Sequence, residues 1–369
     1  MGTTGGRGRA AAGVVKGRGA TASPPSRYLA RVSEAIDDGW ARVPDPECAG
    51  AEVGPATQLL PDRTVTLITR NRSPDVPFDR SINPFKGCEH GCVYCFARPT
   101  HAYLDLSPGL DFETRIFYKT GVRDRLLAEL GHPSYRCAVL AMGTKTDPYQ
   151  PAEKRLRITR TVLEVLREHR HPVSIVTKGQ LILRDLDILA EMAAQGLASV
   201  AVSVTTLDRR LKTALEPRTA DPAARLRVIR TLSWAGIPTR AMLAPVIPFV
   251  NDHEIEAIAE QVASAGAIGM GYIFLRLPLE VADLFRGWLD AHYPERAERV
   301  MAAIRDARGG KAYDPTWGRR MRGEGPIAHL IARRFEVALR RHGLAGGRFE
   351  PLRTDLFCPP GPRQGNLFD

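Results

Sequence analysis

The chain has 369 residues, of which 44% are apolar and 25% are charged, so it is long enough for one barrel-sized domain or two ordinary ones with a substantial core. No run of 18 apolar residues occurs, so we expect no membrane span; six cysteines are too few for a disulfide framework and favour the reducing cytoplasm. The net charge of +11 is concentrated at the ends, with +6 in residues 1–31 and +7 in residues 286–353. This distribution suits contact with nucleic acid; the alternative is a soluble basic protein whose arginine faces are solvated.

The N-terminal part of the chain is poor in apolar residues. Residues 1–25 are rich in Gly, Ala, Ser, Thr and Arg, and we expect them to be disordered because they bury too little apolar surface. A short helix is predicted within residues 28–40, and residues 65–68 form the best strand candidate before the main domain.

Half of the cysteines lie in one loop, within residues 81–99, which read S-I-N-P-F-K-G-C-E-H-G-C-V-Y-C-F-A-R-P. Cys88, Cys92 and Cys95 have the spacing C-x3-C-x2-C, and glycines beside the first two allow a tight backbone turn. Three thiolates are one ligand short of a closed tetrahedral site, so we interpret the loop as holding a [4Fe–4S] cluster with one open iron. The alternatives are a structural zinc site completed by His90 or His101, and three inert buried cysteines.

Strands and helices alternate from residue 81 onward. The predicted strands are short apolar runs typical of parallel strands covered on both faces, at residues 81–85, 137–142, 173–177, 199–204, 239–244 and 272–277. The predicted helices cover residues 152–169, 186–193, 221–236 and 251–266, and an additional strand–helix pair is expected at 116–119 and 122–130. Beyond residue 281 the pattern becomes helical.

The cysteine spacing, with Tyr94 just before the third cysteine, resembles the signature of the radical S-adenosylmethionine (radical SAM) superfamily. The wider loop is similar to a bacterial branch called DNA-repair-photolyase-like, related to spore photoproduct lyase. The similarity continues through the segments T-D-P-Y-Q-P, S-I-V-T-K, R-D-L-D-I-L, L-E-P-R and P-V-I-P, as far as about residue 344. The resemblance implies an α/β fold, a partial parallel (β/α)6 barrel, which periodicity alone does not separate from an open doubly wound sheet.

The resemblance also implies an activity: a [4Fe–4S] cluster held by Cys88, Cys92 and Cys95 cleaves S-adenosylmethionine to a 5′-deoxyadenosyl radical, which abstracts hydrogen from a substrate. We expect a lyase or a transferase with an external electron donor such as flavodoxin or ferredoxin. Nucleic acid, in DNA repair or modification, is the leading substrate class, and a modified protein or a small metabolite is the alternative. The competing interpretation is a non-catalytic, zinc-bound nucleic-acid-binding protein.

Polar residues at the carboxyl ends of the predicted strands are the candidates for binding the cofactor, because ligands of parallel β/α folds lie at that edge. By position, Gly143 and Thr144 resemble the segment that meets the amino group of S-adenosylmethionine, and Lys178 is placed to meet a carboxylate. Glu216 and Arg218, a charged pair separated by proline, are expected to orient the cofactor. The full set of expected cofactor-binding residues is Tyr94, Gly143, Thr144, Thr177, Lys178, Ser203, Glu216 and Arg218. No residue is assigned a catalytic role.

We therefore expect a basic, largely disordered extension over residues 1–75, a radical SAM core over 76–285, a basic helical extension over 286–350 and a flexible tail over 351–369. In the tail, Gln364, Leu367 and Phe368 resemble the Q-x-x-L-F peptides by which bacterial proteins dock to the replication sliding clamp. An idle tail is the alternative.

Overall fold

The computed structural model describes residues 15, 17–29, 56–345 and 350–361. Its main element is a sheet of seven strands in the order β10-β9-β8-β7-β6-β3-β2. Six of them are parallel: β3 (Arg80–Ile82), β6 (Leu140–Met142), β7 (Val173–Thr177), β8 (Ala198–Ser203), β9 (Thr239–Val246) and β10 (Met270–Phe274). The short β2 (Ile68–Arg70) pairs antiparallel with β3 at one edge. Six parallel strands in chain order, with helical crossovers, agree with the expected partial (β/α)6 barrel.

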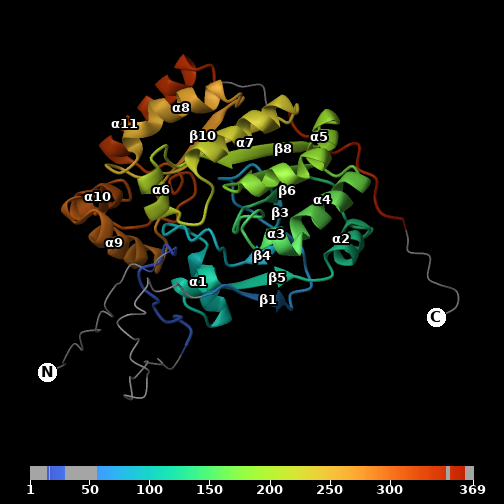
Figure 1. Cartoon of the computed structure of the whole chain (residues 1–369), viewed down its shortest axis with the longest axis horizontal. Helices are drawn as coiled ribbons and strands as arrows, with labels where there is room; N and C mark the ends of the chain where they lie inside the picture. Colours follow the sequence, from blue (N-terminus) through green and yellow to red (C-terminus); the bar gives the residue numbers. More distant parts are fainter. Residues whose placement is uncertain (1–14, 16, 30–55, 346–349, 362–369) are drawn as a thin grey trace, which may run out of the picture.

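Helices follow the strands along one side of the sheet (Figure 1). They are α3 (Glu153–Leu156), α4 (Ile158–Glu168), α5 (Leu186–Ala194), α6 (Arg209–Leu215), α7 (Pro222–Trp234) and α8 (Ile255–Ser264), with short 3₁₀ turns η3 (Gln180–Asp185) and η4 (Asp252–Glu254). In α4, for example, Val162, Leu163 and Leu166 are fully buried against the sheet. The main core lies between these helices and the strands.

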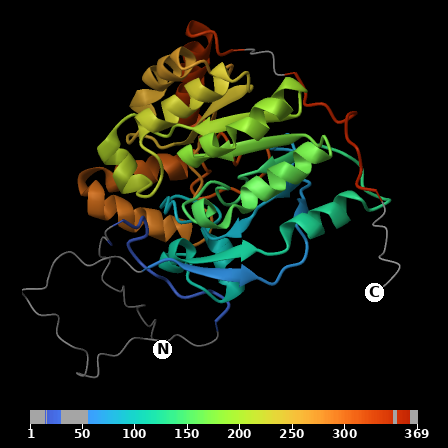
Figure 2. The same ribbon diagram turned by 45° about the vertical axis from the view of Figure 1, so that its right-hand side comes forward.

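A second, three-stranded sheet lies beneath the cysteine loop, in the order β1-β5-β4 (Figure 2). In it, β1 (Gln58–Asp62) runs parallel to β5 (Arg115–Lys119), and β4 (Phe85–Lys86) pairs antiparallel with β5. In chain order, the 3₁₀ helix η2 (Arg98–Leu104) and the short helix α1 (Leu110–Thr114) lie between β4 and β5, and helix α2 (Val122–Leu130) follows β5. The prediction of a strand at residues 65–68 is wrong for its first part, because the side chain of Asp62 accepts a hydrogen bond from the Thr64 N–H and turns the chain after β1.

The C-terminal part of the described chain is helical, as expected. Helix α9 (Val281–His292) packs on α10 (Pro294–Asp306), and α11 (Gly325–Arg341) packs on α8. Side chains of α9 and α10, including Phe285, Trp288 and Val300, form a second apolar cluster with Val93 of the cysteine loop. The expected boundary between residues 285 and 286 therefore falls inside α9. Within the described residues, every helix is too short or too polar to cross a lipid bilayer.

The expected single helix over residues 152–169 is broken into α3 and α4 at Arg157, which adopts a left-handed conformation with φ of 52°. The carboxylate of Glu153 accepts hydrogen bonds from the backbone N–H groups of Thr159 (3.1 Å) and Arg160 (3.4 Å). The N-terminal N–H groups of a helix lack intrahelical acceptors, so this side chain caps α4 and stabilises the break.

The N-terminal segment was expected to be disordered, and this is wrong for residues 17–25. Ala20 is fully buried and Arg18 and Thr21 are nearly so. A Cβ atom added at Gly109 would lie 2.1 Å from the carbonyl oxygen of Ala22, so the segment contacts the start of α1 directly. Figure 1 shows it in dark blue between α1 and α9. The helix expected within residues 28–40 lies mostly outside the described residues.

Candidate active site

The three cysteines of the motif lie in the loop between β4 and η2, at the carboxyl end of β3. Cys88 and Cys92 are buried and Cys95 is half-buried. The loop turns tightly, since the Gly91 N–H donates to Cys88 O (3.4 Å) and the Cys95 N–H donates to Cys92 O (3.2 Å). Gly91 has a φ of +68°, and a Cβ there would lie 2.8 Å from the carboxylate of Glu113, so only glycine fits without displacing that side chain.

A buried ion pair supports this loop from below. Arg98 and Glu113 are both fully buried and pair at 2.5 Å, and Arg98 also donates to the carbonyl oxygen of Cys92 (2.9 Å). The same carboxylate accepts the backbone N–H groups of Gly19 (3.0 Å) and Ala20 (2.9 Å). With these partners the charge of Glu113 is compensated, as a buried carboxylate requires. The N-terminal segment is therefore part of the support of the cysteine loop.

Glu216 connects the cysteine loop to helix α7. Its carboxylate is fully buried and accepts hydrogen bonds from the hydroxyl groups of Tyr94 and Thr205, the latter at 2.7 Å, and it forms an ion pair with Arg225 of α7. Burial opposes its ionisation, but the charges of Arg225 and Lys178 and the hydrogen bonds lower the pKa of Glu216 to about 2. The structure thus brings three of the expected residues, Tyr94, Lys178 and Glu216, together beside Cys92.

Asp147 organises the ends of β6 and β7. One of its oxygens accepts a hydrogen bond from the Thr177 hydroxyl and the other accepts one from the Lys178 N–H, both at 2.7 Å. His90, between the first two cysteines, lies with Nδ1 3.3 Å from the same carboxylate. Burial opposes ionisation, but His90 and these hydrogen bonds lower the pKa of Asp147 to about 2. The hydroxyl of Thr177 is therefore already bonded to Asp147. The ammonium group of Lys178 lies 6.0 Å from the ring centre of Tyr94.

The other expected residues have more varied surroundings. Gly143 has a φ of +83°, and a Cβ there would lie 1.9 Å from the carbonyl oxygen of Val176, so the neighbouring strand requires glycine at this position. The hydroxyl of Thr144 hydrogen bonds to the side chain of Asn83 (3.1 Å), and Ser203 is buried at the end of β8. Arg218 lies on the cysteine loop, with its guanidinium 3.2 Å from Glu89. Glu216 and Arg218, two residues apart in the sequence, therefore have different ion-pair partners in the structure.

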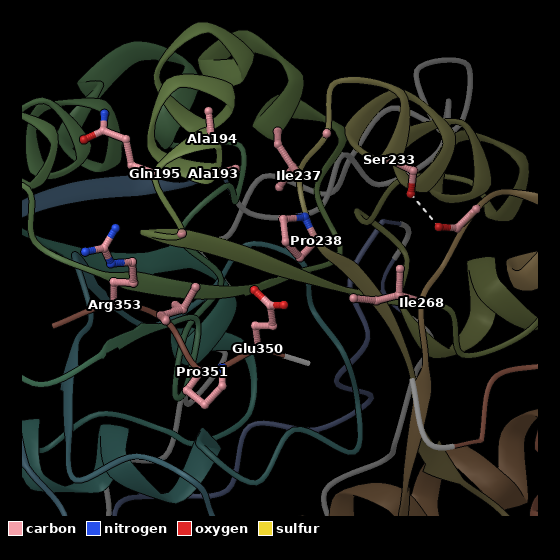
Figure 3. A pocket seen from close by; sticks show the side chains of 14 residues that line it. Ala193, Ala194, Gln195, Ser233, Ile237, Pro238, Ile268, Glu350, Pro351 and Arg353 are labelled. Carbon is pink, nitrogen blue, oxygen red and sulfur yellow. Dashed lines mark hydrogen bonds between the residues drawn. The ribbon is translucent and has the colours of Figure 1, made fainter. Parts of the chain in front are cut away.

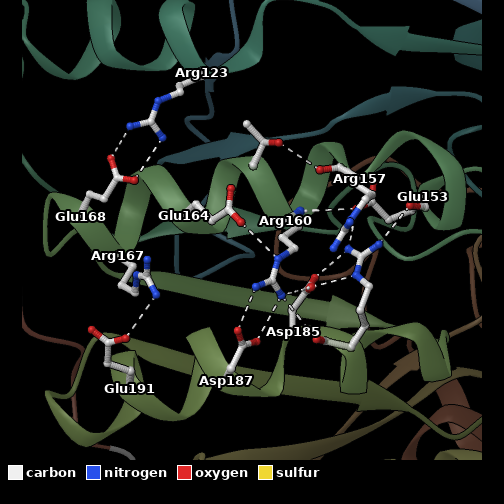
Figure 4. Close-up of polar contacts among 12 residues, drawn as sticks. Arg123, Glu153, Arg157, Arg160, Glu164, Arg167, Glu168, Asp185, Asp187 and Glu191 are labelled. Carbon is white, nitrogen blue, oxygen red and sulfur yellow. Dashed lines mark hydrogen bonds and ion pairs between the residues drawn. The ribbon is translucent and has the colours of Figure 1, made fainter.

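The charged residues of the segment R-D-L-D-I-L belong to an ion-pair network that fixes α4 against α5. Figure 4 shows Arg160 of α4 directed toward Asp185 and Asp187, at 3.0 and 2.8 Å. Arg184 pairs with Glu153 at 2.8 Å. Because both Glu153 and Asp185 are fully buried, this network positions the start of α4, which follows the Asp147 loop.

A pocket at the opposite edge of the sheet is unrelated to this site. It is lined by the loops that precede β8, β9 and β10, including Gly196, Pro238 and Ile268, and by residues 350–353 of the tail (Figure 3). These loops enter the strands at their amino ends, whereas the cysteine loop lies at the carboxyl ends. The tail crosses this edge, where the Arg353 N–H donates to Gly196 O (2.9 Å).

The donor set fits an iron–sulfur cluster. Burial raises the pKa of Cys88 well above its usual range and raises that of Cys92 to about 12, so these thiols ionise readily only beside a strongly positive group such as iron. Among the described residues, no three His, Cys, Asp or Glu side chains converge on a single metal ion. A cuboidal cluster binds each cysteine through a different iron and needs no such convergence.

Sequence reasoning missed the residues that hold the site from outside the motifs: Arg98, Glu113 and Arg225. Each is a charged residue in a helical segment whose local pattern gives no sign of burial. Arg98 alone carried a usable signal, because it lies three residues after Cys95 in the same loop.

The fold and the site define a class: a parallel β/α protein with three cysteine thiols in the loop after its first parallel strand. A family model described as "Radical SAM superfamily" matches residues 82–262. An uncharacterised protein of Mycobacterium tuberculosis is 41% identical over 295 residues, which cover 79% of this chain and 83% of that protein. An uncharacterised protein of Methanocaldococcus jannaschii is 27% identical over 219 residues, covering 59% of this chain and 78% of that protein.

The chain belongs to the radical SAM superfamily and is an enzyme of that class. Enzymes of this family use a [4Fe–4S] cluster and S-adenosylmethionine. Among solved structures, spore photoproduct lyase complexed with dinucleoside spore photoproduct is similar, with a TM-score of 0.50 at 16% identity over 78% of this chain and 80% of that one. At that identity the likeness shows the fold alone.

Proposed function

We propose that Cys88, Cys92 and Cys95 ligate three irons of a [4Fe–4S] cluster and that the fourth iron is left for S-adenosylmethionine. The observation that carries this proposal is the placement of three thiols in one tight loop at the carboxyl edge of the parallel sheet. When bound, the two cofactors supply reductive cleavage to a 5′-deoxyadenosyl radical that abstracts hydrogen from the substrate.

The chain's own residues orient and shield this chemistry. Tyr94 and Lys178 border the site beside Cys92, and the ionised Glu216 fixes the Tyr94 hydroxyl. The cation of Lys178 is suited to the carboxylate of the cofactor. The polar groups of Thr144, after β6, and Ser203, at the end of β8, are suited to its amino and ribose groups. Helices α9 and α10, packed on Val93, exclude water from the back of the loop.

Anaerobic purification and reconstitution with iron and sulfide tests the ligand assignment. The native chain should bind about four irons, as the cubane requires, and form 5′-deoxyadenosine from S-adenosylmethionine under a strong reductant. Cys92→Ala should lose iron and cleavage together, whereas Cys358→Ala, which removes an exposed thiol of the tail, should lose neither. A colourless protein with one zinc per chain would instead favour the zinc-bound nucleic-acid-binding alternative.

We propose nucleic acid as the substrate class, in a DNA repair or modification reaction. The basic ends of the chain support this, as does the likeness in fold to an enzyme solved with a dinucleoside photoproduct. Binding of a single-stranded oligonucleotide should weaken steeply with added salt, because released counterions contribute much of the affinity. Deuterium transfer from labelled nucleic acid into 5′-deoxyadenosine would identify the substrate directly.

We also propose three features of the cellular setting: a reducing cytoplasm, an external electron donor such as flavodoxin or ferredoxin, and docking to the sliding clamp. The five described cysteines are all free thiols, which suits a reducing compartment. Gln364, Leu367 and Phe368 lie outside the described residues, and the clamp proposal rests on their spacing alone. A labelled peptide of residues 359–369 should bind the clamp, and Phe368→Ala should remove that binding.

A further inference from the structure

Arg276 is a half-buried arginine at the carboxyl end of β10. Its guanidinium carbon lies 4.5 Å from the ring centre of Phe96, the residue that follows Cys95. It makes no hydrogen bond or ion pair with any residue that the structure describes. Burial lowers the pKa of Arg276, and a desolvated guanidinium with unused donors is unfavourable unless a ligand satisfies it.

A second arginine stands behind the first. Arg308, after α10, is only 2% exposed, and its guanidinium donates to the carbonyl oxygens of Phe274 (3.3 Å), Leu275 (2.9 Å) and Arg319 (3.0 Å). These acceptors are neutral, so its charge is not cancelled. Burial and the neighbouring charge of Arg276 lower the pKa of Arg308 to about 10. Arg308 thus binds the backbone carbonyl groups at the end of β10, and the segment that follows carries the second cation, Arg276.

The acidic groups near this pair are already engaged. Asp75 pairs with Arg320 and accepts the Gly318 N–H, and Asp314 lies 3.6 Å from Arg319. Neither carboxylate forms an ion pair with Arg276 or Arg308. The end of β10 therefore keeps an excess of positive charge beside the cysteine loop.

Exposed aromatic rings accompany this charge. Phe96 is 43% exposed, and Trp317, which precedes the Asp75-bound Gly318, is 57% exposed. Large apolar rings are normally buried, and exposed rings beside arginines are the arrangement by which proteins hold single-stranded nucleic acid, with bases stacked and phosphates paired. The sequence shows no such interleaving, because Phe96, Arg276 and Trp317 are far apart along the chain.

We propose that Arg276, supported by Arg308, binds a phosphodiester group of the nucleic-acid substrate, with an adjacent base stacked on the exposed part of Phe96. The planar guanidinium matches two phosphate oxygens. Its position next to Cys95 places the bound nucleotide at the carboxyl edge of the sheet, where the proposed radical forms. This inference rests on the proposed function and names the residues that would select its substrate.

Oligonucleotide binding by the full chain tests the inference. With a fluorescent single-stranded DNA, Arg276→Gln should weaken binding about tenfold or more and reduce the slope of log affinity against log salt by about 0.7, the value for one lost phosphate contact. Arg276→Lys should recover part of the affinity. Arg230→Gln, which removes an exposed arginine of α7, should change the affinity less than twofold, about the size of a lost surface charge. Thermal unfolding by circular dichroism should show that all three variants fold.

The outcomes separate this inference from the function on which it rests. A peptide nucleic acid of the same sequence, which has bases but no phosphates, should not compete with the DNA; equal competition would overturn the phosphate assignment. If the native chain binds DNA with salt dependence and Arg276→Gln binds equally well, the inference is wrong and the proposed substrate class stands. If the native chain binds no nucleic acid, both fail.

Discussion

Tyr94 donates its hydroxyl hydrogen to Glu216, and this contact joins the cysteine loop to the turn after α6 across 122 residues of sequence. Burial raises the pKa of Tyr94 well above its usual range, while that of Glu216 is lowered to about 2, so the phenol remains the donor and the carboxylate the acceptor. Arg225 completes the arrangement by pairing with the same carboxylate. A charged residue deep in the core thus fixes a ring at the candidate active site.

Glu216→Gln should destabilise the protein by about 3–5 kcal/mol, because it leaves the charge of Arg225 buried without its partner. Urea unfolding measures the change. Glu191→Gln is the control, since Glu191 forms an exposed pair with Arg167 at 3.4 Å and its loss should cost under about 1 kcal/mol. Equal losses in the two variants would contradict the role given to Glu216.

Gly143→Ala should destabilise more than Gly236→Ala, although both glycines have a positive φ. At Gly236 an added Cβ meets nothing within 4 Å, so only backbone strain of about 1–2 kcal/mol is expected. At Gly143 the same atom would lie 1.9 Å from Val176 O and would force β6 away from β7. Comparing the two unfolding free energies isolates the clash; similar values would show that the strand spacing is not tight there.

Gly19→Val should displace the N-terminal segment from the cysteine loop. A Cβ at Gly19 would lie 1.7 Å from the carbonyl oxygen of Gly91, and the segment would lose the hydrogen bonds of Gly19 and Ala20 to Glu113. We expect faster hydrogen exchange at residues 17–29 and a loss of about 1–3 kcal/mol. Gly361→Val, where a Cβ meets nothing within 4 Å, should alter neither measurement, and unchanged exchange in Gly19→Val would show that this contact does not hold the segment.

Stability should fall as the pH drops from about 6.5 toward 4, partly through His171. This ring is fully buried between Tyr135 and Phe357, and its two nitrogens bond the Tyr135 hydroxyl (2.8 Å) and the carbonyl oxygen of Pro172 (3.0 Å). Burial lowers the pKa of His171 to about 4, so the unfolded chain, with its ordinary value near 6.5, takes up the proton first.

Between pH 7.5 and pH 5, His171 should contribute a loss of about 2 kcal/mol. His171→Gln should show a correspondingly smaller loss over that interval in urea unfolding, whatever its stability at pH 7.5. His132→Gln, which replaces an exposed histidine, should keep the native pH dependence. A native slope in His171→Gln would exclude His171 as the titrating group.

Features with a local cause were predictable from the sequence. The strand at residues 173–177 and the helix at residues 122–130 match β7 and α2 in full. Both patterns are local: a short run rich in β-branched residues indicates a strand, and apolar residues that repeat every 3.6 positions indicate a helix. Wrong predictions arose where a carboxylate captures backbone N–H groups: Glu153 interrupts the helix over residues 152–169 from within it, and Glu113, distant in the sequence, orders residues 17–25.

The cysteine spacing, the glycines beside it and the alternation of strands and helices are properties of neighbouring residues, so the sequence by itself determined the superfamily and the loop that carries the chemistry. The tertiary structure alone decided which charges meet. It assigned Arg225 to Glu216 and Glu89 to Arg218, and it placed Arg276, which has no ion-pair partner in the part of the chain that the structure describes, beside Phe96. Buried charges are paired by proximity in space, and the sheet brings together residues that no local pattern relates.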